Sequence, residues 1–156
     1  MQKVDIYIYG SCHFYEKKEG ENPLGDGGYG AVVVIDGEKF TEICGGSFPD
    51  TTNARMDKIA FIEAVGTITT KSEITVYLSN DYMLKAFSLN WIEKWRKENF
   101  RQRRHRDLWL EMNKILLESG HSFCFLNSKE LKNNEYLEQA KLMAQNSSYK
   151  YPEKTM

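Results

Sequence analysis

A dense run of positive charge, interleaved with aromatic rings, lies in the middle of the chain. Residues 94–106 read KWRKENFRQRRHR, and the basic members are Lys94, Arg96, Lys97, Arg101, Arg103, Arg104 and Arg106. Trp95 and Phe100 stand between them, and Glu98 is the only acid in the run. Cations at this density hold phosphate groups without reading base sequence. The run predicts a nucleic-acid-binding surface; the alternative is a solvated helix face whose tryptophans lie in the core.

The overall composition gives no general attraction for a polyanion. The 156 residues carry 21 Lys and Arg against 22 Asp and Glu, for a formal net charge of -1 at pH 7. Binding to nucleic acid must therefore come from a local cluster of charge. With 41% hydrophobic and 28% charged residues, one globular domain with a single core is expected. No apolar signal core or membrane-spanning run is present, which favours a cytoplasmic protein.

Three cysteines, Cys12, Cys44 and Cys124, are widely spaced along the chain. Their odd number and the absence of a CxxC pair argue against both a disulfide framework and a zinc site. We expect reduced thiols, and we expect Cys12 to be a small, partly buried apolar side chain rather than a nucleophile.

The elements that would position these residues follow from hydrophobic periodicity. Alternation predicts a first strand from Val4, ended by a turn at Gly10 and Ser11. Further strands are expected over residues 29–35, 38–44, 74–79 and 123–126, with a hairpin turn at 36–37. Helices are expected over residues 53–65, 81–87, 90–99, 107–119 and 134–145. A loop over residues 13–26 and a frayed tail over 147–156 complete the reading, which leaves one domain over 1–146.

This order predicts an α/β fold with a mixed five-stranded sheet: a three-strand antiparallel meander followed by two parallel strands, with helices on its faces. The order and five local motifs resemble type 1 ribonuclease H, the bacterial ribonuclease HI-like proteins. The motifs lie at residues 10–12 (GSC), 27–31 (GGYGA), 51–57 (TTNARMD), 91–95 (WIEKW) and 107–109 (DLW). None is specific alone, but together, in order and on the expected elements, they indicate homology over nearly the whole chain.

The resemblance implies two catalytic divalent metal ions held by four carboxylates, as magnesium requires. Carried over position by position, those acids fall at Tyr9, Asp57, Asn80 and Leu137. Only Asp57 is still acidic. A phenol is uncharged at neutral pH, and its ring would occupy the space that the metals need. The histidine that precedes the last helix in the family is also missing from residues 127–132. We therefore expect a degenerate site, no resident cofactor, and Mg or Mn only if other acids have rewired the site.

Three functions remain open from the sequence. The first is a catalytically inactive relative that binds RNA–DNA hybrid or double-stranded RNA through the basic run. The resemblance adds Gly10, Ser11, Cys12, Thr52, Asn53 and Arg55 as further nucleic-acid contacts, whereas simple helix capping would also explain Thr52 and its neighbours. The second is an active, metal-dependent hybrid ribonuclease with a rewired site. The third is a structural or protein-interaction module, with a protein partner bound by the loop over residues 13–26.

Overall fold

A single mixed sheet organises the protein, which we describe from a computed structural model over residues 1–15 and 24–148. The sheet has the order β3-β2-β1-β4-β5. Its strands are β1 (Gln2–Phe14), β2 (Gly25–Ile35), β3 (Glu38–Thr51), β4 (Ser72–Leu78) and β5 (Ser122–Asn127). Strands β1 to β3 pair antiparallel, whereas β4 pairs parallel with both β1 and β5. This arrangement confirms the predicted meander and the two parallel strands.

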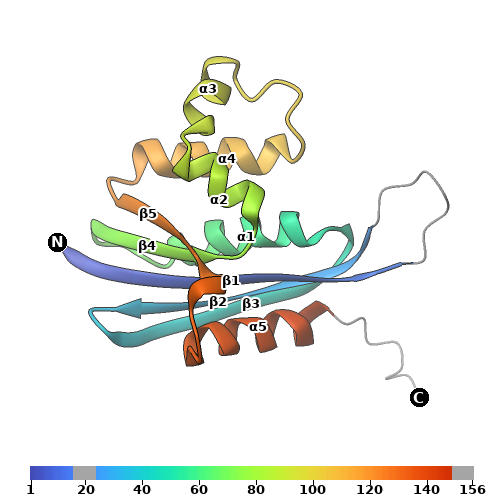
Figure 1. Cartoon of the computed structure of the whole chain (residues 1–156), viewed down its shortest axis with the longest axis vertical. Helices are drawn as coiled ribbons and strands as arrows, with labels where there is room; N and C mark the ends of the chain where they lie inside the picture. The colour runs from blue at the N-terminus through green and yellow to red at the C-terminus, as the bar shows by residue number, and fades with distance from the viewer. Residues whose placement is uncertain (16–23, 149–156) are drawn as a thin grey trace.

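Helices cover the two faces of the sheet unequally (Figure 1). One face carries α1 (Asn53–Val65), α2 (Asp81–Ser88), α3 (Trp91–Lys97) and α4 (Arg106–Glu118), and the other carries α5 (Glu135–Ser148). A short 3-10 helix, η1 (Ser128–Glu130), follows β5. Among the described residues, no helix is long and apolar enough to cross a membrane.

The alternation of β1 divides the core into two clusters. Ile6 and Ile8 are buried against α1 in the larger cluster, which also holds the α3 and α4 tryptophans Trp95 and Trp109. Tyr7, the residue between them, belongs to a smaller cluster built around Ala140 of α5. Successive side chains of a strand point to opposite faces, so this single strand supplies both cores.

The meander is longer than the sequence indicated, and the predicted turn at Gly10 and Ser11 is wrong. These residues continue β1 and pair with Tyr29 and Gly28 of β2. Glycine at position 10 serves close packing, because a Cβ there would lie 2.7 Å from the backbone nitrogen of Asp57. The predicted loop over 13–26 is correspondingly shorter, since His13, Phe14, Gly25 and Asp26 belong to strands, and its residues 16–23 lie outside the described residues.

The last helix also extends past its predicted end. Helix α5 runs to Ser148, so residues 147 and 148 belong to it rather than to a tail. Ser148 is fully buried, and the backbone of Ser147 lies close to Gly28 and Gly46 of the meander. Packing against the glycines of β2 and β3 therefore holds the final turn, which periodicity within the helix does not show. Residues 149–156 of the predicted tail lie outside the described part of the chain.

Candidate functional site

The one acid at the four family positions, Asp57, lies buried on α1 beside the end of β4. Only 6% of it is exposed, and Asn80 Nδ2 donates a hydrogen bond to its Oδ2 at 3.3 Å. Asn80 is also the N-cap of α2, where its Oδ1 accepts a hydrogen bond from the backbone nitrogen of Met83 at 2.9 Å. Capping fixes the asparagine amide with its nitrogen toward the carboxyl group. The pair is therefore a hydrogen-bonded structural unit at two of the positions that the resemblance assigns to metal ligands.

Burial changes the charge of Asp57. Desolvation raises its pKa to about 7, against the opposing effects of the Asn80 hydrogen bond, the charge of Lys58 and a backbone hydrogen bond from Gly10. At neutral pH a large fraction of this carboxyl group is protonated. A protonated carboxyl group is a poor ligand for a hard divalent cation, which needs anionic oxygen.

Tyr9 and Leu137, the other two positions that the resemblance assigns to metal ligands, both lie on the α5 face of the sheet. Both pack against the smaller core cluster together with Met143. Lys141 Nζ lies 5.9 Å from the centroid of the Tyr9 ring. This cation–π contact places a positive charge over the ring on the side of α5.

Two of the four positions, Asp57 and Asn80, are joined by a hydrogen bond, whereas Tyr9 and Leu137 each pack against the smaller core cluster. Gly10, the residue after Tyr9, lies against Asp57, so Tyr9 and the contact of Asp57 fall on adjacent residues of β1. In the described ranges, no group of three or more His, Cys, Asp or Glu could hold a metal ion. A partly protonated carboxyl group, an amide and a phenol are too few and too weakly charged to hold two divalent cations. These residues do not fit the metal pair that the resemblance implies.

The basic run forms a protrusion, residues 91–106, that comprises α3 and the segment leading into α4 and stands away from the sheet (Figure 1). Its exposed cations are Lys94, Lys97, Arg101, Arg104 and Arg106. Arg96 and Arg103 are half-buried and take part in packing: Arg96 Nε donates to Asn113 Oδ1 at 2.7 Å, and the Arg103 guanidinium lies 4.5 Å from the Trp95 ring centroid. The tryptophans pack in the core, while most of the charge remains at the surface.

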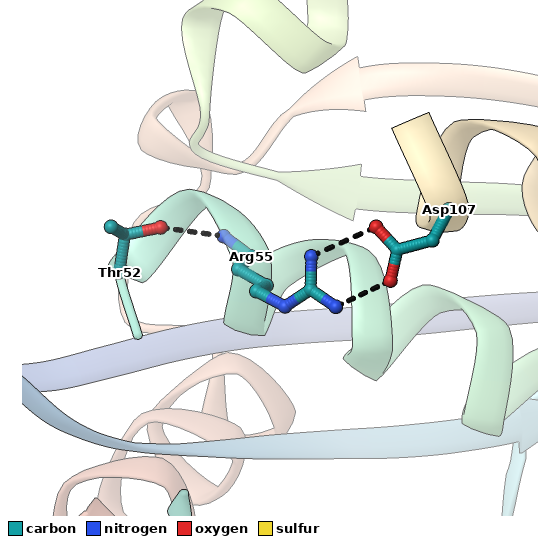
Figure 2. A network of polar contacts seen from close by, with 3 residues as sticks. All are labelled: Thr52, Arg55 and Asp107. Atoms are coloured by element: carbon teal, nitrogen blue, oxygen red, sulfur yellow. Dashed lines mark hydrogen bonds and ion pairs between the residues drawn. The ribbon is translucent and has the colours of Figure 1, made fainter. Parts of the chain in front are cut away.

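A second polar network ties α4 to α1 (Figure 2). Thr52 is the N-cap of α1 and accepts a hydrogen bond from the backbone nitrogen of Arg55 at 3.1 Å. The Arg55 guanidinium makes a two-point contact with the Asp107 carboxylate in the first turn of α4, with Nη1 to Oδ1 at 3.0 Å. Thr52 thus caps the helix, as the alternative reading expected, and Arg55 is engaged within the protein. Asn53 is exposed.

Residues of the first-strand motif at 10–12 also make contacts within the fold. Cys12 Sγ lies 3.5 Å from the carbonyl oxygen of Thr51, and burial followed by the charge of Asp26 raises the pKa of its thiol. A raised pKa leaves the thiol protonated, which agrees with a structural role rather than a nucleophilic one. Ser11 pairs with Gly28 within the sheet.

Two functional candidates have no clear signal in the sequence. Lys58, next to Asp57, is only 3% exposed and lines a pocket, and His105 lines the same pocket. Burial, followed by the charges of Lys58, Arg104 and Arg55, lowers the pKa of His105 to about 4, so its ring is neutral at pH 7. Lys58 lies off the apolar stripe of α1, where a lysine is ordinarily solvated, and its burial depends on α4 packing above it.

Comparison with known proteins identifies the relatives of this chain. A family model described as RNase H matches residues 1–151. The ribonuclease H of Acetivibrio thermocellus is 33% identical over 141 residues, covering 87% of this chain and 88% of that protein. The ribonuclease H of Ehrlichia canis is 34% identical over 149 residues, covering 92% and 93%.

Solved structures agree at the level of the fold. LC11-RNase H1 in complex with RNA/DNA hybrid has a TM-score of 0.64 at 15% identity, and the match covers 94% of this chain and 96% of that one. The foamy viral protease-reverse transcriptase in complex with RNA/DNA hybrid has a TM-score of 0.71 at 15% identity, covering 94% of this chain and 20% of that one. The family match and the two relatives establish that the chain belongs to the ribonuclease H family, with the fold of its type 1 members.

Proposed function

We propose that this ribonuclease H relative binds a nucleic-acid duplex, RNA–DNA hybrid or double-stranded RNA, through its basic protrusion and does not cleave it by two-metal hydrolysis. The observation that carries the proposal is the contrast between two sites. The protrusion has five exposed cations, whereas the four positions to which the resemblance carries the metal ligands hold Tyr9, Asp57, Asn80 and Leu137.

The protrusion is suited to a phosphate backbone. Arg101 and Arg104 are exposed on its outer segment, and neither is among the described ion pairs. The two-point Arg55–Asp107 contact fixes the start of α4, so the segment that carries Arg101 and Arg104 is anchored at its C-terminal end. Binding to phosphates in this way is insensitive to base sequence and weakens as salt displaces the protein.

The loss of cleavage is argued from ligand chemistry. Hydrolysis by two metals requires carboxylates that neutralise adjacent dications. Burial of Asp57 makes its charged form costly, and Asn80 serves to cap α2. Tyr9 and Leu137 pack in an apolar cluster of the α5 face. Restoring a metal pair here would require several new acids together.

Hybrid binding should be measured by fluorescence anisotropy across a salt series. We expect weak binding at low salt, with the logarithm of the association constant falling linearly with the logarithm of salt concentration. Arg101→Ala with Arg104→Ala should reduce affinity and flatten the slope by roughly two phosphate contacts.

The matched control removes the same charge elsewhere. Lys3→Ala with Lys71→Ala also deletes two exposed cations, at the far end of the β1–β4 pair. This variant should keep the wild-type slope. Equal losses in both double variants, or no binding at low salt, would contradict the proposal and favour a protein-interaction module.

The curated relatives are named ribonuclease H, which supports hydrolysis of RNA–DNA hybrid as the competing function. In that case Asp57 and acids outside the four family positions would together bind Mg or Mn in a rewired site. Metal-dependent cleavage that disappears in Asp57→Asn would favour this alternative.

A further inference from the structure

The two edge strands of the sheet differ in how well they are protected against pairing with another chain. β3 has a shifted register with β2 at three places, and it contains a proline and four charged residues: Glu38, Lys39, Glu42, Pro49 and Asp50. Charge, proline and irregular register are features that keep an exposed strand edge unpaired. β5 (SFCFLN) contains no charge and no proline, and it pairs with β4 in unbroken register. The edge formed by β5 therefore lacks these protections.

The outer edge of β5 is open. The strand lies at one end of the sheet, and within the described ranges no backbone hydrogen bond joins residues 122–127 to an element other than β4. Phe123 and Phe125 are half-buried against the larger core cluster, and Leu126 is 44% exposed. An uncharged edge with unpaired N–H and C=O groups is a template for one more strand.

The absence of charge extends beyond the strand and indicates which partner fits. Residues 119–128 contain no Asp, Glu, Lys or Arg, in a chain of which 28% of residues are charged. Burial lowers the pKa of His121, so its ring is neutral at pH 7. In a two-fold contact each group lies close to its own copy, so a charged edge would repel itself. A neutral edge is therefore complementary to a second copy, whereas a charged peptide would find no opposite charge along it.

The alternation of side chains limits how two copies can pair. A two-fold axis perpendicular to the sheet makes the two β5 strands antiparallel, and residues opposite each other must then point to the same face. Phe123 and Phe125 face the larger core cluster, so Cys124 between them faces the other side. A register centred on Cys124 sets Phe123 opposite Phe125 of the second copy, whereas a register centred on Phe125 sets Phe123 opposite Asn127. Aromatic pairs across strands are favourable, which selects the register centred on Cys124.

We propose that two copies of this chain associate through β5, edge to edge and antiparallel about a two-fold axis at Cys124, to form one continuous sheet. The shared edge is only six residues long, which is short for a stable interface, so the dimer is weak and forms at high protein concentration. The axis keeps both basic protrusions on the same side of the joined sheet (Figure 1). A duplex that reached both protrusions would bind more tightly than to one, a consequence that rests on the proposed function.

Self-association should be measured by sedimentation equilibrium of the full chain over a concentration series, without nucleic acid. We expect a monomer–dimer equilibrium that shifts toward the dimer as concentration rises. Cys124→Lys should weaken the dimer about fivefold or more, because the two lysines would face each other across the axis. The matched control is Cys44→Lys, which replaces an exposed cysteine on the protected strand β3 and should leave the equilibrium unchanged.

Opposite charges separate a direct contact from a loss of folding. Cys124→Glu alone should also weaken the dimer, whereas a mixture of Cys124→Lys and Cys124→Glu should associate at least as well as the wild type. A short bismaleimide should link two wild-type copies through Cys124. This link should persist in Cys44→Ser and be lost in Cys124→Ser.

A monomer at all concentrations up to about 1 mM would overturn the proposal. A dimer that Cys124→Lys leaves intact, or one that is cross-linked through Cys44, would overturn the assignment to β5. Because these measurements contain no nucleic acid, their outcome does not depend on duplex binding. A strictly monomeric protein that binds hybrid in a salt-sensitive way would refute the dimer and leave the proposed function standing.

Discussion

At the scale of single residues, burial makes the charged form of Asp57 less favourable. The ordinary carboxyl pKa of 3.8 is raised to about 7 by burial, so folding favours the protonated form. A group whose pKa is raised by folding contributes stability that is present below its unfolded pKa and lost as pH rises through the folded value. For Asp57 the window of loss is between about pH 4 and pH 7.

Replacing this acid should therefore flatten the dependence of stability on pH. Between about pH 5 and pH 8, the free energy of unfolding of the wild type should fall by on the order of 2 kcal/mol relative to Asp57→Asn, which has no proton to lose. Urea unfolding of both proteins at each pH measures the difference. Parallel behaviour of the two proteins would show that Asp57 is ionised throughout this range.

A second prediction at this scale concerns the missing ligands. Tyr9→Asp alone should not give magnesium binding, because Asp57 and one new acid leave a metal pair short of ligands. Tyr9→Asp, Asn80→Asp and Leu137→Asp together should give binding detectable by calorimetry. The triple variant should be less stable without magnesium, since clustered carboxylates repel one another. Absence of magnesium binding in a folded triple variant would show that the backbone has also moved away from the family geometry.

At the scale of elements, the Arg55–Asp107 contact connects the N-terminus of α1 to that of α4. The two side chains are 32% and 62% exposed, so solvent screens their attraction. Asp107 also lies in the first turn of α4, where the helix dipole favours an acid.

Arg55→Ala should cost about 1 kcal/mol or less of global stability, in keeping with a partly exposed pair. We expect its larger effect to be local, as faster amide hydrogen exchange at the start of α4, because the pair anchors that turn. Asp107→Ala should give the same local effect, and the double variant should add little to either. Additive losses in the double variant would show that the two side chains act independently.

The sequence predicted the elements well because periodicity and caps are local. Helix α1 begins at Asn53 after the capping residue Thr52, as predicted, and the meander was visible from Asp36 and Gly37. The ends of the meander were not visible locally. Gly10 looked like a turn residue, but pairing with Tyr29 and contact with Asp57 hold it in β1. The last turn of α5 likewise depends on glycines of other elements.

In the candidate site too, local sequence patterns identified some residues, whereas contacts between distant elements determine the roles of others. Motif spacing brought attention to Asp57 and Asn80, and the structure joins them by a hydrogen bond. The engagement of Arg55 with Asp107, and the burial of Lys58 beneath Trp109, result from packing between α1 and α4. Neither contact has a signature within a single helix.

At the scale of the whole molecule, the chain has the architecture of its family. The sheet and the placement of the helices follow the family pattern, and the basic protrusion stands at one edge of them (Figure 1). Because a net charge of -1 gives no general attraction for nucleic acid, binding must rely on the cations of the protrusion. We expect the protein to hold a duplex weakly and in a salt-dependent way, beside a site that we propose does not hold a metal pair.

The claim that the protein binds a hybrid without cleaving it is tested most directly by a cleavage assay on a labelled RNA–DNA hybrid. The assay is run at a protein concentration at which fluorescence anisotropy shows that the hybrid is bound. Mg²⁺ and Mn²⁺ are supplied in separate reactions, with a bacterial ribonuclease H as the positive control. We predict that the hybrid is bound and remains intact with either metal. Cleavage that requires the metal and is abolished in Asp57→Asn would contradict the account and establish an active, rewired ribonuclease.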